Sequence, residues 1–489
     1  MSEEFKYRDI ELEIRRAIED GLFQPHEKLP SIRGLMTRHQ VGKNTVIRAY
    51  QDLEAQGWIY SLPRSGYRVA ERKSSLDNQA SAPSRVDLLS MSKSILAEPV
   101  VKHHMPAGSA HPCTDSPAIR SLYAEIGRHS RMQTHIPSHY QLPPGNDQLV
   151  RQIRKICRDL GIEARLRDIA ITNGGQQALS LAFRALTQPG DIVAVESPCY
   201  FGTLLLLESL GLKVVEIPSQ LTTGMDIEAL KQAISRWRVK AVMVTPNFNN
   251  PTGALMPLAH RQALLDVTDS IPIIEDDVFG SLGFSEALPS LKSLDQQERV
   301  IYISSLSKTL DSRLRIGWII AGRYMNQIEK VLLSENMGSL NLIQSAVAAF
   351  LSTGRYRTHL ARMRRLYHSR QLRFAQMLSQ AFNSHPELNG RYHLSRPQGS
   401  FLCWLTLPAE VDTQLVYQHC LSEKISLLPG HLFANQGQFT QCIRFSVSNL
   451  EDETRWQKSL QVLAVIIVQQ LTRSSGKTLS EQTQSELND

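Results

Sequence analysis

The chain has 489 residues, of which 42% are hydrophobic and 21% are charged, with a formal net charge of +7. This length allows roughly two to four domains and excludes a peptide or a disulfide mini-scaffold. The apolar run at residues 462–468 is too short for a membrane span, which needs roughly 20 residues, and the N-terminus has no apolar segment after a basic start. We therefore expect neither a membrane segment nor a secretory signal.

The cysteines are spaced too far apart to form a Cys-x-x-Cys pair. This spacing in a long chain is typical of reduced thiols in a cytoplasmic protein. The histidines, including the pair His103 and His104, also lack metal-ligand spacing. We expect no metal site. The six cysteines are Cys113, Cys157, Cys199, Cys403, Cys420 and Cys442.

Charge is distributed unevenly along the first 70 residues. Residues 3–27 contain eight acidic and four basic side chains, whereas residues 28–68 contain seven basic and two acidic ones. A basic segment of this kind is typical of a surface that binds a phosphate backbone.

The same region predicts three helices followed by a hairpin. An apolar pattern of helical period ends at Gly21, Ser31 is a candidate N-cap for a second helix, and a third helix ends at Gly57. Residues 58–60 and 67–69 are β-prone and flank a turn. Three helices and a β-wing form a winged helix-turn-helix.

The strings LPSIRGL, VGKNTVIRAYQDLEAQGWI and RSGYRV resemble the winged-helix head of the GntR family of bacterial transcription regulators. The resemblance implies that residues 1–70 bind a double-stranded DNA operator, with the start of the third helix in the major groove. Gly42-Lys43 stands where a Ser-Arg pair often opens that helix. The implied DNA-binding residues are Arg33, Lys43, Asn44, Thr45, Arg64, Ser65 and Gly66.

Composition divides the rest of the chain into three parts. Residues 71–86 are polar and lack aromatic side chains, which predicts a linker. Residues 87–471 form a large domain, and residues 472–489 are rich in Ser, Thr, Gln and Glu, which predicts a disordered tail.

In the large domain, short β-prone strings alternate with helical segments. This alternation predicts an α/β fold with a mostly parallel sheet that is covered on both faces. The predicted strands are 169–172, 192–196, 213–217, 241–245, 271–275, 300–304 and 317–320.

Polar motifs follow several of these strands, where open α/β sheets bind ligands. Asn173-Gly174-Gly175-Gln176 opens a helix and forms an anion site. Glu275-Asp276-Asp277 places carboxylates at the end of an apolar strand, where they need a cationic partner such as a protonated pyridine nitrogen. Lys308 and Arg315 supply an amine and a guanidinium, which suits a Schiff-base lysine with a phosphate anchor. Arg444, within a strand, suits capture of a carboxylate.

The ordered motifs GGQ, SPCY, NNPTG, EDD, SxSK, R and IRFS resemble the fold-type I aminotransferases, which bind pyridoxal 5′-phosphate (PLP). The resemblance implies that Lys308 forms the Schiff base, that Asp276 pairs with the pyridinium nitrogen, and that Asn250 donates to the ring O3′. Tyr200 is implied to stack on the ring, and Arg444 to bind the carboxylate of an effector. The implied phosphate contacts are Gly174, Gly175, Gln176, Ser305, Ser307 and Arg315, together with Tyr140 donated to the neighbouring subunit.

Two features depart from or extend this pattern. Phe279 stands where many of these enzymes have a tyrosine that supports O3′, so a donor worth about 0.5–1.5 kcal/mol is missing. The helical segment 355–370 contains six arginines, which is usually a solvated face and alternatively a secondary DNA contact.

A GntR-like head joined to an aminotransferase-like domain is the organisation of the MocR-type regulators. The resemblance implies a cytoplasmic homodimer in which each head packs against the other subunit's large domain, and in which PLP on Lys308 senses an amino-group effector or the cofactor level. On this reading we expect no physiological turnover. Two alternatives are a true aminotransferase with an accessory DNA-binding domain and a DNA-binding protein whose large domain only dimerises.

Overall fold

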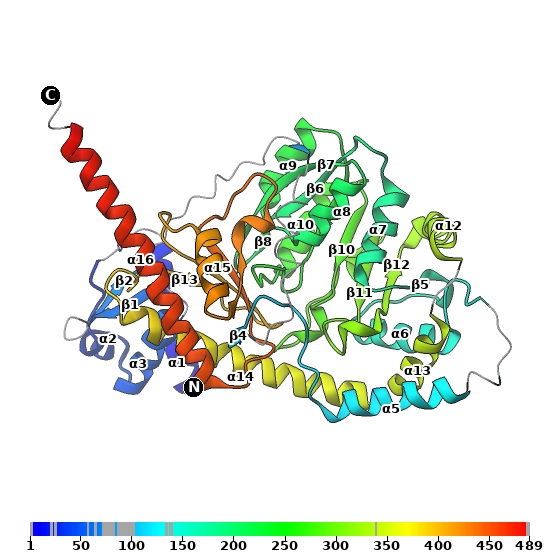
Figure 1. Ribbon diagram of the computed structural model, residues 1–489, viewed down its shortest axis with the longest axis horizontal. Helices are drawn as coiled ribbons and strands as arrows, with labels where there is room; N and C mark the ends of the chain where they lie inside the picture. The colour runs from blue at the N-terminus through cyan, green and yellow to red at the C-terminus, as the bar shows by residue number, and fades with distance from the viewer. Residues whose placement is uncertain are drawn as a thin grey trace.

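The structure is a computed structural model, and it describes residues 3–19, 23, 27–55, 58–62, 66–70, 84–85, 103–132, 135, 140–337 and 340–485. A small head, residues 3–70, lies at one end of a large α/β body, and the chain ends in a long helix (Figure 1). Within the described residues, no helix is long and apolar enough to cross a membrane.

The head is a winged helix-turn-helix, as predicted. Ser31 caps the second helix by accepting a hydrogen bond from the Gly34 backbone N–H at 3.1 Å. Leu35, Val46 and Leu53 are buried in an apolar core of the head's own residues. The elements are α1 (Glu3–Glu19), α2 (Ile32–His39), α3 (Lys43–Ala55), β1 (Ile59–Leu62) and β2 (Gly66–Val69), with β1 and β2 antiparallel.

The body is built on a mostly parallel sheet in the order β3-β7-β6-β9-β10-β11-β12-β5. Each of the seven predicted strands is present, and the predicted ends differ from the observed ends by at most three residues. The strand β12 runs antiparallel to both of its neighbours. The bounds are β5 (Ile169–Thr172), β6 (Ile192–Ser197), β7 (Lys213–Gln220), β8 (Gly224–Met225), β9 (Val239–Val244), β10 (Ile273–Asp276), β11 (Val300–Ser305) and β12 (Gly317–Ile320).

Helices cover both faces of this sheet because its side chains alternate between two cores. Val193 and Val195 belong to one apolar cluster, and Ala194 between them belongs to another. The first cluster includes α7 (Gly175–Leu186), α8 (Phe201–Ser209) and α12 (Met325–Asn336). The second includes α9 (Ile227–Arg236), α10 (Leu258–Thr268) and α11 (Leu291–Leu294). A third, at the β12–β5 end, includes α5 (Pro117–Met132), α6 (Asp147–Asp159) and α13 (Asn341–Ser352).

A second, four-stranded sheet lies between the large sheet and the head (Figure 1), and we call it the small sheet. Its order is β13-β14-β17-β16, and every pair is antiparallel. Its strands are β13 (His393–Leu394), β14 (Leu402–Thr406), β16 (Leu428–Pro429) and β17 (Cys442–Ser446). Its apolar core is shared with α14 (Arg355–Asn383), α15 (Thr413–Ser422) and α16 (Glu453–Ser485). A short parallel pair joins β4 (Met105–Pro106) to β15 (Ile425–Ser426).

Two boundary predictions need correction. The last residues of the predicted linker form β3 (Ser84–Arg85), which pairs antiparallel with β7 because the edge of β7 offers free backbone groups. The helix α16 continues to Ser485, past Thr472, where we expected a disordered tail to begin. A helix anchored by packed residues such as Trp456 and Leu460 propagates at little cost per added residue. Residues 71–83, 86 and 486–489 lie outside the described residues.

Candidate functional site

The predicted Schiff-base lysine lies in the body, just after β11. The Lys308 Nζ donates a hydrogen bond to the carbonyl oxygen of Ala110 at 2.8 Å. The pKa of Lys308 is lowered from 10.5 to about 8, chiefly by burial and then by the cation Arg444, with a smaller contribution from Arg315, while Asp276 opposes the shift. A lysine with this pKa is a much better nucleophile at neutral pH than an exposed one.

The two adjacent aspartates at the end of β10 have different surroundings. Asp276, 6% exposed, accepts a hydrogen bond from the Val278 backbone N–H at 3.2 Å. Asp277 accepts bonds of 2.7 Å from the Asn247 amide and of 2.7 Å from the Tyr302 hydroxyl. Burial raises the pKa of Asp276 to about 7, so a cation beside it would be needed to keep it ionised. The family resemblance assigns the ring nitrogen to Asp276, and Asp277 is engaged instead by the side chains of Asn247 and Tyr302.

The predicted phosphate contacts come together at the N-terminus of α7. Gly174 caps this helix with a φ of +83°, and a Cβ atom added there would lie 2.6 Å from the Arg315 guanidinium. Arg315 donates to the carbonyl oxygen of Asn173 at 3.0 Å. Ser305 and Ser307 are joined by a hydroxyl–hydroxyl bond of 2.9 Å. Backbone N–H groups, a guanidinium and hydroxyls at a helix N-terminus form an anion site.

Three other predicted residues lie around this site. Gly175 lies close to Ser305, because a Cβ atom added to Gly175 would lie 3.9 Å from the Ser305 Cβ. Gln176 donates its side-chain amide to the carbonyl oxygen of Gly202 at 2.8 Å, so it holds the start of α8. Burial is the main cause that raises the pKa of Tyr200. Asp276 also raises this pKa, whereas Arg444 and Arg315 lower it, so the phenol lies among these three charged groups.

Arg444 lies on β17 and is 2% exposed. Its guanidinium donates to the carbonyl oxygen of Gly108 and lies 5.9 Å from the centre of the Phe433 ring. Burial lowers its pKa to about 10, and Tyr200 opposes this shift. A buried guanidinium favours an anionic ligand, and a carboxylate suits its planar fork.

Two buried polar atoms of this site have no hydrogen-bond partner among the residues that the structure describes. They are the Oδ1 of Asn250 and the Nε of Arg444. Unsatisfied buried polar atoms are costly and call for a partner. A carboxylate-bearing ligand would supply an acceptor for the Arg444 Nε. The Asn250 Oδ1 is itself an acceptor, and a flip of this side-chain amide would turn its NH₂ donor toward an anionic ring oxygen. With that orientation of Asn250 the residues present fit PLP.

The site also contains residues that the sequence analysis did not find. The segment around β4 contributes the carbonyl oxygens of Gly108 and Ala110 to Arg444 and Lys308. Burial is the main cause that lowers the pKa of His111, and the positive charges of Lys308 and Arg444 add to the effect. The imidazole is therefore neutral near pH 7. These contacts join positions about 200 to 340 residues apart in the chain, and no local motif marks them.

Phe279, which stands where many aminotransferases have a tyrosine, is buried beside Lys308. The Lys308 Nζ lies 5.8 Å from the centre of its ring, and the Phe401 ring packs on it edge to face at 5.6 Å. Phenylalanine thus occupies an apolar pocket at this position.

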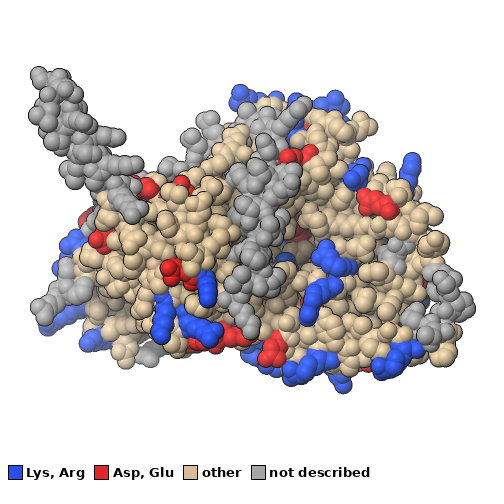
Figure 2. Space-filling model, in the orientation of Figure 1, with Lys and Arg blue, Asp and Glu red and all other residues tan. Residues whose placement is uncertain are grey.

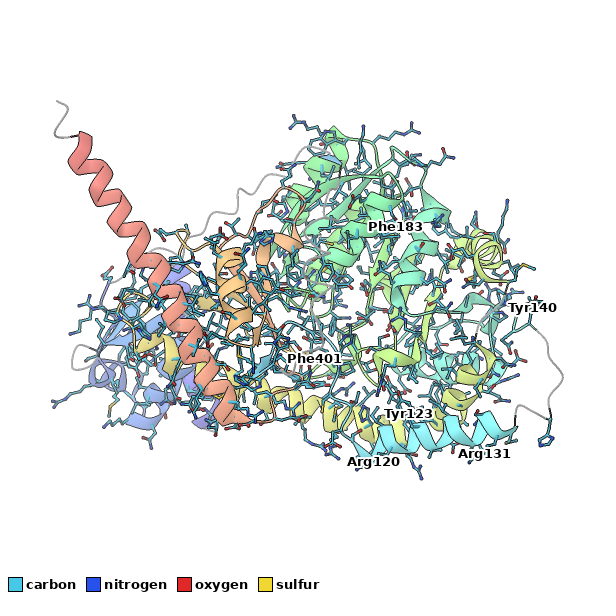
Figure 3. All side chains as sticks on the ribbon, viewed as in Figure 1. Arg120, Tyr123, Arg131, Tyr140, Phe183 and Phe401 are labelled. Carbon is cyan, nitrogen blue, oxygen red and sulfur yellow. The ribbon has the colours of Figure 1, made fainter. Side chains whose placement is uncertain are left out.

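Tyr140 lies apart from the other predicted contacts. Its side chain is 74% exposed and lies at the outer edge of the chain, away from the interior residue Phe401 (Figure 3). Within one chain it is not part of the cofactor site.

The predicted DNA-binding residues lie on the head. Arg33, Lys43 and Asn44 are exposed, and Figure 2 shows basic side chains on the part of the surface formed by the head. Gly66 begins β2 and is exposed. Thr45 differs from the prediction, because its side chain is buried, with 9% exposed. Arg64 and Ser65 lie outside the described residues.

Two family models match the chain. The model described as aminotransferase class I and II matches residues 133–456, and the model described as bacterial regulatory proteins, gntR family, matches residues 6–69. The HTH-type transcriptional regulator YjiR of Escherichia coli K12 is 33% identical over 457 residues, which cover 92% of this chain and 96% of that protein. The HTH-type transcriptional regulator NorG of Staphylococcus aureus USA300 is 26% identical over 435 residues, which cover 84% and 93%.

Solved aminotransferases share the fold of the body. The multiple substrate aminotransferase of Thermococcus profundus superposes with a TM-score of 0.71 at 22% identity, covering 78% of this chain and 96% of that one. LysN of Thermus thermophilus, an α-aminoadipate aminotransferase complexed with N-(5′-phosphopyridoxyl)-L-leucine, superposes with a TM-score of 0.69 at 25% identity, covering 78% and 95%.

A GntR-type winged helix and a class I and II aminotransferase fold in one chain define transcription regulators with an enzyme-like body. This chain belongs to that family, the MocR-type regulators of the GntR group. The family and the site together indicate pyridoxal 5′-phosphate as the cofactor.

Proposed function

We propose that this protein is a PLP-dependent regulator of transcription whose body senses an amino-group effector or PLP itself, and whose head binds a DNA operator. The observation that carries the proposal is the presence, in one chain, of an exposed recognition-helix start at Lys43 and Asn44 and a buried amine–guanidinium pair at Lys308 and Arg444. Bound PLP supplies an aldehyde that condenses reversibly with primary amines.

The chain's own residues would bind and orient the ligand. The helix N-terminus at Gly174, with Arg315, Ser305 and Ser307, would hold the phosphate, and Asp276 would hold the protonated ring nitrogen. Asn250 would donate to the ring oxygen, Tyr200 would stack on the ring, and Arg444 would bind a carboxylate of the effector. Since the Gly108 carbonyl oxygen already accepts from Arg444, effector binding would compete with that contact.

We further propose that the protein works as a cytoplasmic homodimer. The segment after Tyr140 meets the start of α13, where the Asn146 backbone N–H donates to the Gln344 side chain at 2.7 Å. Leu142 and Leu340 there are both more than half exposed. A second copy of the chain covering this surface would bury Tyr140 and bring it to the partner's phosphate site. Sedimentation would test this, with Leu142→Asp expected to give monomers.

The proposal is tested by the visible spectrum of the purified full chain with PLP and a panel of amino acids. We expect a PLP absorbance band that changes at saturating amino acid for at least one member of the panel, together with a change in affinity for a DNA fragment selected from a random pool. No band with PLP in excess, in a chain that still binds DNA, would favour a body that only dimerises.

The rival function is an aminotransferase with a DNA-binding accessory, since both Lys308 and Arg444 are present. Phe279 disfavours it, because the pocket lacks the phenol that many such enzymes place there. Amino transfer to a keto acid inside the ordinary enzyme range of about 1–10³ s⁻¹ would make the enzyme the better description.

A further inference from the structure

Three asparagines in the loop after β9 have three different surroundings. The strand β9 lies between β6 and β10 in the sheet. The Asn247 amide donates to Asp277, just after β10, at 2.7 Å, whereas the Asn249 amide donates to Glu196 of β6 at 2.8 Å. Both neighbouring strands therefore hold the loop. The third asparagine, Asn250, has an Oδ1 without a hydrogen-bond partner among the described residues, so its side chain is available to a ligand.

A buried arginine holds both ends of this loop. Arg261 lies near the start of α10 and is 0% exposed. Its Nε donates to the Met256 carbonyl oxygen at 2.9 Å, and its Nη2 donates to the Pro246 carbonyl oxygen at 3.3 Å. The same Nη2 donates to the Asn247 Oδ1 at 2.6 Å, and the Nη1 donates to the Pro289 carbonyl oxygen at 2.8 Å. One guanidinium thus closes the loop and binds a side chain within it.

The Asn247 amide links two buried charged groups. It accepts from Arg261 and donates to Asp277, so the cation and the carboxylate polarise the amide in the same sense. Burial raises the pKa of Asp277, whereas the bonds from Asn247 and Tyr302 lower it. The charge of Arg261 lowers the pKa of Asp277 as well. Because a buried charge is costly without a partner, Arg261 favours the ionised form of Asp277.

Both ends of this chain of bonds lie next to a predicted cofactor contact. Asn247 is three residues before Asn250 in the same loop, and Asp277 directly follows Asp276. Burial is the main cause that raises the pKa of Asp276, and the charge of Asp277 adds to it. The hydrogen bonds of Arg261 go to neither Asn250 nor Asp276, yet the guanidinium is connected to both through one intervening residue.

We propose that Arg261 is a positioning residue for PLP. Through Asn247 it fixes the loop that presents Asn250 to the ring oxygen. By way of Asp277 it balances the charge beside Asp276, the proposed partner of the ring nitrogen. The inference rests on the proposed roles of Asn250 and Asp276. Absence of a PLP absorbance band in the unmodified chain would overturn both, whereas a band that ignores every change at Arg261 would overturn this inference alone.

The most direct variant is Arg261→Gln, with Arg299→Gln as the matched control. Arg299 is 3% exposed and holds the other end of α10, where it donates to the Thr268 hydroxyl at 2.7 Å. Both variants should lower the unfolding temperature of the unloaded chain, because each leaves buried acceptors unpaired. Only Arg261→Gln should weaken PLP binding, by about tenfold, the size expected for one lost hydrogen bond. Absorbance titration of the full chain with PLP measures this, and equal PLP affinity in the two variants would overturn the proposal.

The pH midpoint of the visible absorbance change of the PLP-loaded chain is a readout that a loss of stability alone does not move. Arg261→Gln should shift the midpoint upward, because removal of a nearby cation favours the protonated form of the bound cofactor. Asp277→Asn removes an anion and should shift it downward, and the double variant should lie between the two. An unchanged midpoint in Arg261→Gln, or an equal shift in Arg299→Gln, would show that Arg261 acts on stability only and would overturn the proposal.

A milder variant keeps the proposal testable if Arg261→Gln does not fold. Asn247→Ser retains both charges, but a serine hydroxyl is too short to make the bonds of 2.6 and 2.7 Å that the amide makes to Arg261 and Asp277. Asn383→Ser is its control, since the Asn383 amide also joins two side chains, Ser379 and Tyr392, each at 3.1 Å. We expect several-fold weaker PLP binding in the first variant only. Equal PLP affinity in both would contradict positioning through Asn247.

Discussion

The amine of Lys308 donates to the carbonyl oxygen of Ala110 at 2.8 Å, and burial lowers its pKa to about 8. Because the neutral amine is the nucleophile, the rate of PLP uptake should rise about tenfold per pH unit below pH 8 and level off above it. Stopped-flow absorbance of PLP with the unloaded chain measures this, with Nα-acetyl-lysine as the control. A rate that still climbs steeply between pH 9 and 10 would mean that the amine has an ordinary pKa.

Asp276 and Asp277 should respond differently to the same change. Asp276→Asn should weaken PLP retention at least tenfold without lowering the unfolding temperature of the unloaded chain, because it removes the partner of the ring nitrogen. Asp277→Asn should cost about 1.5–3 kcal/mol of stability, because a charged acceptor of the Asn247 and Tyr302 bonds is lost. Thermal unfolding and PLP titration of both variants check this; the reverse pattern would reassign the cofactor aspartate.

The close approach at Gly174 predicts a specific loss. Gly174→Ala would place a Cβ atom 2.6 Å from the Arg315 guanidinium and should weaken binding of PLP. Gly161→Ala is the control for backbone strain alone, since its φ of +77° is similar and nothing lies within 4 Å of its added Cβ. Both variants should lose about 1–2 kcal/mol of stability. Equal PLP affinity in the two variants would exclude Gly174 from the phosphate site.

Phe279→Tyr should restore a hydroxyl near the cofactor. The Lys308 amine lies 5.8 Å from the centre of the Phe279 ring, so an added phenol would stabilise a negative oxygen on bound PLP. We expect the pH midpoint of the visible absorbance change of the PLP-loaded chain to shift downward. Phe279→Leu, which adds no donor, should not shift it downward. Identical midpoints in the tyrosine variant and the unmodified chain would show that this position does not tune the cofactor.

On the head, Lys43→Ala should weaken DNA binding and flatten its salt dependence by roughly one unit of slope, because one phosphate contact is lost. Arg38→Ala is the control, since Arg38 pairs with Glu13 at 2.9 Å. Fluorescence polarisation over a salt series measures both slopes. If the two variants have the same slope, Lys43 is not a specific phosphate contact.

The motifs of the cofactor site could be predicted from the sequence because the strand ends of an α/β sheet converge. Gly174 and Lys308 lie just after β5 and β11, Asp276 ends β10, and Arg315 lies just before β12, which runs antiparallel to β11, so the structure brings them together at one edge of the sheet. The carbonyl oxygens of Gly108 and Ala110 could not be predicted, because backbone groups carry no sequence signal. The burial of Thr45 likewise depends on how an element packs, which local pattern does not fix.

PLP-dependent sensing is tested most directly by comparing the unmodified full chain with Lys308→Ala. The measurements are borohydride-stable PLP labelling and the DNA affinity with and without amino acids that change the spectrum. We predict labelling on Lys308 alone, normal DNA affinity of the variant without ligand, and loss of its response to amino acids. Labelling at another lysine, or a variant whose DNA binding still responds to the amino acid, would contradict PLP-dependent sensing at this site.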